Sequence, residues 1–159
     1  MMRAVAELYE RARTDAGRLE AALHVEQVAA LAYAAAADGP LAGAERAQAL
    51  RFADHERSHA AAFETMLFAF TVPVRERAGQ ADLEAVLPGL DRAGRTEALR
   101  RLAELEEAAI AGHQLMGRRM LELDPLRTVA MVMAGGAQHL VVLREALREE
   151  LTKTLETGV

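Results

Sequence analysis

Five acidic and histidine side chains interrupt helical stripes that otherwise contain apolar residues. Residues three and four positions apart share a helix face, so each stripe can be read from the sequence. The interrupting residues stand near the middle of four separate stripes: Glu26, Glu56, His59, Glu106 and His139. Carboxylates and imidazoles are ligands that suit iron, manganese or zinc. These residue types therefore indicate metal chemistry, provided that the fold brings them together.

Burial of several carboxylates in one place is unfavourable, because each loses its hydration and they repel one another. Such burial is tolerated when the acids are paired with cations, protonated or bound to a metal. The four stripes contain no lysine or arginine that could pair them. Two interpretations stay open: a metal site, or a vestigial site held by hydrogen bonds and protonated acids.

The positions of these residues along their helices favour convergence. Glu26 lies about 12 residues before the first loop, and Glu56 lies about 14 residues after it. Glu106 lies about 15 residues before the last loop, and His139 lies about 14 residues after it. At ~1.5 Å per residue, the heights within each pair agree to within one helical turn. All the polar groups can therefore share one layer.

Four long helices are predicted to position these residues. The apolar periodicity predicts helices over about 18–38, 44–70, 95–121 and 124–153. Asp38-Gly39-Pro40 ends the first, while Asp124-Pro125 has the cap-then-proline pattern that opens the fourth. Residues 2–13 are also amphipathic and either extend the first helix or form a separate one. Because helix formers dominate and β-branched and aromatic residues are sparse, we expect an all-α fold.

The connections predict how the helices are arranged. Short loops join the first helix to the second and the third to the fourth, which predicts two antiparallel hairpins. Residues 71–94 form a long crossover between the hairpins, with room for a short helix near 81–86. One long crossover between two hairpins is the topology of ferritin-like four-helix bundles. We expect a single domain over 1–159, with the core bundle over about 18–153.

The same residues resemble the motif set of the ferritin-like superfamily, in particular its small bacterial members. In that family one helix of each hairpin gives a single Glu, and its partner gives Glu-x-x-His. Glu26 matches the first Glu, Glu56-Arg57-Ser58-His59 is a complete Glu-x-x-His, and Glu106 matches the Glu of the third helix. The fourth helix has Gly136-Ala137-Gln138-His139, so its histidine is kept while glycine replaces the Glu. Tyr33 follows the first Glu by seven residues, as the family often has it.

The resemblance implies a role for each residue. Glu56 would be shared or bridging, Glu26 and Glu106 would be terminal ligands, and His59 and His139 would bind through nitrogen. One metal position would have Glu26, Glu56 and His59. The second would have only Glu106, His139 and the shared Glu56, because Gly136 supplies no carboxylate.

The implied cofactor is iron or manganese, with zinc as a further option, and the implied reaction is with dioxygen or peroxide. If the site turns over, the protein would be an oxidoreductase of the di-iron or di-manganese type. The alternative is a non-enzymatic helical module with a vestigial site, acting through homodimerisation or partner binding. We expect a homodimer formed through the apolar fourth helix.

Composition excludes several other kinds of site. The absence of cysteine excludes disulfides, thiolate metal sites and iron–sulfur clusters. The formal net charge of -5 argues against nucleic acid as a partner. The longest uncharged run, 128–143, falls short of the ~20 residues that span a bilayer, so we expect no membrane segment. Because the N-terminus does not resemble a signal peptide, we expect a cytoplasmic protein.

The other histidines fall outside the five-residue set. His24 and His55 lie off the apolar stripes and are expected at the surface. His113 lies two turns beyond Glu106, roughly 10 Å along the helix axis. We therefore expect His113 to be too distant to bind the same metal, though near enough to line its cavity.

Overall fold

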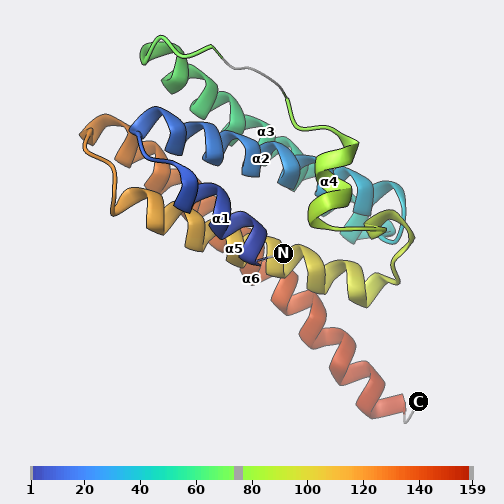
Figure 1. Cartoon of the computed structure of the whole chain (residues 1–159). Coiled ribbons are helices and arrows are strands. Elements are labelled where there is room, and N and C mark those ends of the chain that lie inside the picture. The colour runs from blue at the N-terminus through green and yellow to red at the C-terminus, as the bar shows by residue number, and fades with distance from the viewer. Residues whose placement is uncertain (1, 74–76, 158–159) are drawn as a thin grey trace.

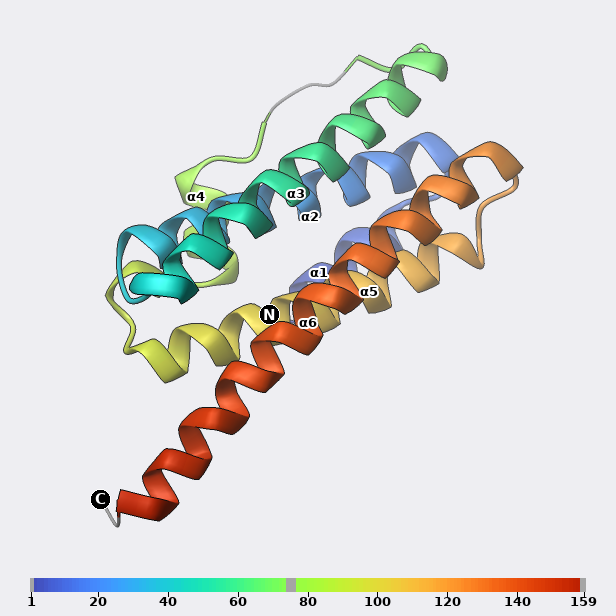
Figure 2. The ribbon, with the colours of Figure 1, turned by 180° about the vertical axis from the view of Figure 1, so that it is seen from behind.

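The described chain is helical throughout. A computed structural model describes residues 2–73 and 77–157, with side chains described over 5–73 and 77–148. The elements are α1 (Met2–Arg11), α2 (Asp15–Asp38), α3 (Gly43–Ala69), α4 (Gln80–Val86), the short 3₁₀ helix η1 (Leu90–Arg92), α5 (Arg95–Gly117) and α6 (Leu123–Thr157). In Figure 1, α2 lies beside α3, α5 lies beside α6, and α1 lies against α5. Figure 2 shows the C-terminal part of α6 extending beyond the other helices.

Local hydrogen bonds explain where the helices begin and end. Thr14 accepts the Gly17 N–H at 3.1 Å and caps α2, so α1 is a separate helix. Helix α5 ends at Gly117, before the predicted 121, and α6 begins at Leu123, one residue before the predicted cap. The loop between them is held by Asp15, whose carboxylate accepts the N–H groups of Leu121 and Glu122. These two N–H groups therefore do not form the hydrogen bonds that would extend α5.

The crossover is fixed to the helical body by its own short helix. The predicted helix near 81–86 is α4, and Leu83 within it is buried. Before α4, the Ala78 N–H donates to Gln27 Oε1 on α2 at 2.9 Å. After α4, Leu87 and Leu90 are buried in the same apolar cluster as Leu83. Residues 78–90 therefore pack against α2 through their apolar side chains.

The buried apolar side chains form two clusters. One includes Val28, Phe52 and Leu102. The other includes Leu23, Phe63 and Met116. In each long helix, one buried polar residue stands between members of the two clusters: Glu26, Glu56, Glu106 and His139. The core is thus two apolar halves with a polar layer between them.

Helix α6 is the one described helix that could cross a membrane by length and composition, over Leu123–Arg148. A single such helix is weak evidence, because the core helix of a soluble protein passes the same test. The stretch carries Gln138 and His139 near its middle, and His139 is buried in the polar layer. Helix α6 therefore contributes both apolar and polar side chains to the buried core.

The contact between α1 and α5 depends on a glycine. The Tyr9 ring is 1 % exposed and lies edge-on to His113, with ring centroids 5.8 Å apart. A Cβ added at Gly112 would lie 2.3 Å from Tyr9 Cε2, far inside van der Waals contact. Gly112 is therefore required for α1 to approach α5 this closely.

We expect Gly112→Ala to destabilise the protein. Overpacking typically costs about 1–3 kcal/mol and should outweigh the ~1 kcal/mol that alanine adds in helix propensity. Gly117→Ala is the matched control on the same helix, because its Cβ would meet only Leu126 at 3.8 Å and Val129 at 4.0 Å. Urea denaturation measures both variants. Equal stability of the two would show that Tyr9 does not pack against Gly112.

Candidate metal centre

The five predicted residues meet at mid-height of the four long helices. Glu26 comes from α2, Glu56 and His59 from α3, Glu106 from α5, and His139 from α6. The three carboxyl side chains are 3–4 % exposed and that of His139 is 2 % exposed, whereas that of His59 is 19 % exposed. The layer is therefore enclosed by the two apolar clusters and reaches solvent near His59.

Glu56 lies at the centre of two ligand groups. His59 Nδ1 is 2.8 Å from Glu56 Oε2 and 3.0 Å from Glu26 Oε2. His139 Nδ1 is 2.8 Å from Glu56 Oε1 and 3.0 Å from Glu106 Oε1. The groups are Glu26/Glu56/His59 and Glu56/Glu106/His139, and within each group the ligand atoms lie within 4.8 Å of one another. Each group offers two carboxylates and one imidazole to a single ion.

Burial sets the protonation of the metal-free layer. Burial, together with the nearby charge of Glu56, raises the pKa of Glu26 well above its usual range. Burial also raises the pKa of Glu106. Burial alone would raise the pKa of Glu56, but contacts with Glu26, His139 and His59 outweigh it and lower that pKa. Burial opposes the charge on His139, yet the nearby carboxyl groups of Glu106 and Glu56 raise its pKa to about 9. The metal-free layer therefore keeps a proton on Glu26 and negative charge on Glu56, beside a protonated His139.

Two further side chains hold the Glu106/His139 group in place. The Tyr33 hydroxyl donates to Glu106 Oε1 at 2.5 Å. His55 Nδ1 lies 3.1 Å from His139 Nε2, and the two rings are stacked with centroids 5.4 Å apart. His55 is exposed as predicted, but the sequence pattern missed this contact because His139 reaches it across the α3–α6 interface. His24, by contrast, is half-buried and lies 3.8 Å from Asp82.

His113 lies closer to the layer than predicted. Its Nε2 is 3.3 Å from Glu26 Oε1, although the pair lacks hydrogen-bond geometry. The prediction considered only the rise along α5, whereas the long side chain of Glu26 reaches toward His113 from α2. Burial lowers the pKa of His113 to about 4, so the ring is neutral near pH 7. His113 thus presents a buried nitrogen, without a hydrogen-bond partner, next to one of the predicted ligands.

Paired glycines bring α6 close to the layer. A Cβ at Gly135 would lie 2.8 Å from His59 Cε1, and one at Gly136 would lie 2.9 Å from Glu106 Oε2. Gly136 is buried and faces Glu106, on the same side of α6 as His139. These two glycines lower the helix propensity of α6, but they allow it to approach α3 and α5 closely.

The donor set fits a divalent cation. Carboxylate oxygens and imidazole nitrogens suit iron, manganese and zinc. Glu56 Oε1 is buried without a hydrogen-bond partner, because His139 Nδ1 directs its hydrogen bond to Glu106. An ion bound between Glu56 and Glu106 would satisfy that oxygen. Helix α6 adds no carboxylate to this group, because Gly136 carries no side chain.

The fold and donor set define a class of helical proteins with a buried carboxylate–histidine layer. A family model described as a ferritin-like domain matches residues 14–149, and the chain belongs to this family. The match confirms the resemblance inferred from the motifs. Searches of curated proteins and of solved structures gave no significant match.

Stability in EDTA should depend on which acid is replaced. The pKa of Glu26 is raised from its ordinary value of 4.5, so its contribution to stability is fully present below pH 4.5 and is lost as pH rises. Glu26→Gln should therefore stabilise the metal-free protein at pH 7.5, with a smaller gain at pH 5. The pKa of Glu56 is lowered, so its contribution is present at pH 7.5 and Glu56→Gln should destabilise. Urea denaturation at both pH values measures this, and changes of the same sign at pH 7.5 would contradict the assignment.

Restoring the missing carboxylate should complete the second group. Gly136→Glu is expected to bind more metal per chain and to oxidise Fe(II) faster than the wild type. Without metal it should be no more stable, because a fourth acid and the 2.9 Å approach of its Cβ to Glu106 Oε2 offset a propensity gain of up to ~1 kcal/mol. Ala137→Glu is the matched control, since it adds the same charge at an exposed neighbouring position. Anaerobic Fe(II) titration followed by exposure to air measures both quantities. If Gly136→Glu and Ala137→Glu bind the same amount of metal and oxidise Fe(II) at the same rate, position 136 does not contribute a ligand to the polar layer.

Proposed function

We propose that this ferritin-like protein binds iron or manganese, with zinc as a further option, in the polar layer. The observation that carries the proposal is the position of Glu56, whose two oxygens each lie 2.8 Å from a different histidine. A carboxylate so placed can be shared by two ions, one in each ligand group. The family match supports the same interpretation.

The contacts support a role for each ligand. Glu56 would be the shared ligand, and Glu26 and Glu106 would be terminal ligands. His59 and His139 bind through Nδ1, the nitrogen that each directs at the carboxylates. His139 must lose its Nδ1 proton before it binds the metal. Its remaining N–H, on Nε2, can then donate a hydrogen bond to His55 Nδ1. Metal binding should therefore release protons.

The surroundings suit redox chemistry. Bound iron or manganese would supply electron exchange with dioxygen or peroxide. The apolar clusters on both sides exclude water from the layer, while the partly exposed His59 marks the side nearest solvent. Tyr33 keeps its hydroxyl proton, because burial and the neighbouring Glu106 raise its pKa.

We include in this proposal the arrangement of two helical hairpins joined by the 71–94 crossover.

A second candidate function has an observation in its favour. Along α6, large apolar side chains are exposed, among them Met131 at 68 %, Val141 at 67 % and Val142 at 42 %. A homodimer formed through this face would cover them. Together with the carboxylate missing at Gly136, this supports a non-enzymatic module that acts by association.

Metal binding should raise the thermal midpoint. A ligand that binds only the folded chain stabilises it by ~2.7 kcal/mol at a hundredfold excess over Kd. We expect Fe(II) under anaerobic conditions, or Mn(II) or Zn(II), to raise Tm, and Glu56→Ala to remove the response. Glu64→Ala is the control on the same helix, since Glu64 lies outside the layer and pairs with Arg77. An unchanged Tm with every metal would leave the association function as the better account.

A further inference from the structure

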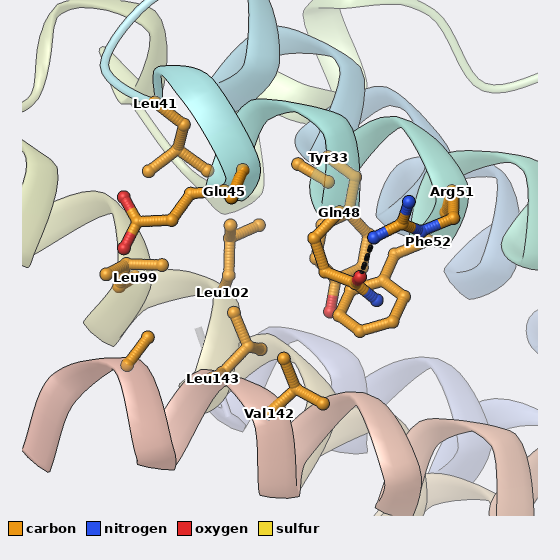
Figure 3. Close-up of a pocket in the computed structure, with 13 residues that line it drawn as sticks. Tyr33, Leu41, Glu45, Gln48, Arg51, Phe52, Leu99, Leu102, Val142 and Leu143 are labelled. Carbon is orange, nitrogen blue, oxygen red and sulfur yellow. Dashed lines mark hydrogen bonds between the residues drawn. The ribbon is translucent and has the colours of Figure 1, made fainter. Parts of the chain in front are cut away.

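A second cavity lies beside the polar layer and contains none of its five residues. It measures about 250 Å³ and opens between the first part of α3 and α6. Figure 3 shows its apolar wall, formed by Leu41, Leu99, Leu102, Val142 and Leu143. For comparison, a cavity of ~150 Å³ lined by Leu, Ile and Phe is known to bind benzene. This cavity is large enough for an aliphatic chain of about eight carbons.

One end of the cavity touches the candidate metal centre. Tyr33 and Phe52 line that end and are both buried. The Tyr33 hydroxyl donates to Glu106, and the Phe52 ring stacks on His139 with centroids 3.9 Å apart. A molecule in the cavity would therefore lie one side chain away from the Glu106/His139 group.

The rim of the cavity carries an uncompensated positive charge. Glu45 lines it, but both oxygens of Glu45 accept hydrogen bonds from Arg95. Arg51 also lines it and donates only to the neutral Gln48 (Figure 3). Among the side chains that the structure describes, no carboxylate lies within ion-pair distance of Arg51. The rim therefore favours an anionic end group.

We propose that this cavity binds a free aliphatic carboxylate of medium length, with its chain against the leucines and its carboxylate at Arg51. Burial of the chain supplies most of the affinity, and Arg51 distinguishes an anion from a neutral or cationic head. Binding itself does not depend on metal. Only the influence of the ligand on the metal centre, through Tyr33 and Phe52, rests on the proposed function.

Octanoate is the probe, titrated into the full-length metal-free protein by calorimetry. We expect saturable binding of one octanoate per chain, with octanol and octylammonium at least tenfold weaker. Arg51→Glu should weaken octanoate binding at least tenfold, whereas Arg57→Glu should not, since Arg57 is exposed on the same helix outside the cavity. Ala146→Phe, at a half-buried lining position, should fill the space and abolish binding.

Three outcomes would overturn the proposal. Equal binding of octanol and octylammonium would show that Arg51 does not select the head group. Unchanged octanoate binding by Ala146→Phe, with native circular dichroism, would place the ligand elsewhere. Absence of octanoate binding, together with a dimer in sedimentation experiments that Ala146→Phe disrupts, would show that a second copy covers the cavity. Since none of these measurements uses metal, a failure here is distinguishable from a failure of metal binding.

Discussion

The structure depends on the burial of Glu56 between two histidines. Charge in a low-dielectric core must be compensated, and here the compensation comes from His59 on one side and His139 on the other. The apolar clusters are interrupted at this height in every long helix. Glycine at 135 and 136 lets α6 approach closely enough for His139 to complete the layer. A purely apolar core would avoid the desolvation penalty of buried charges. The presence of the acids therefore points to a ligand.

Much of the fold could be predicted from the chain alone, because local rules determine it. Helical periodicity and breakers such as Gly39-Pro40 predicted an all-helical chain, and the family match confirms the ferritin-like class. The boundaries were less predictable where distant residues decide them. The carboxylate of Asp15 holds the loop before α6 from the far end of the sequence, and no local pattern indicates that contact. Likewise, Tyr9 of α1 packs against Gly112 of α5, a contact between residues far apart in the sequence that no local pattern indicates.

The candidate site was predictable in its residues and less so in its surroundings. Glu26, Glu56, Glu106 and His139 stand out because each is polar on an apolar stripe, and helix rise alone brings them to a similar height. His55 does not stand out, because it lies off its own stripe and meets His139 only across a helix interface. His113 was placed too far away, because rise along one helix ignores the reach of a glutamate from another. Side-chain length and helix crossing are tertiary properties that spacing does not encode.

Anomalous diffraction from a crystal grown with Mn(II) would show directly whether the polar layer binds metal. We expect anomalous density in the layer, between Glu26, Glu56 and His59, between Glu56, Glu106 and His139, or at both positions with Glu56 shared. The second position should have lower occupancy, because Gly136 supplies no carboxylate. Density confined to surface carboxylates, with the layer empty at saturating Mn(II), would contradict the proposal of a metal site in the layer.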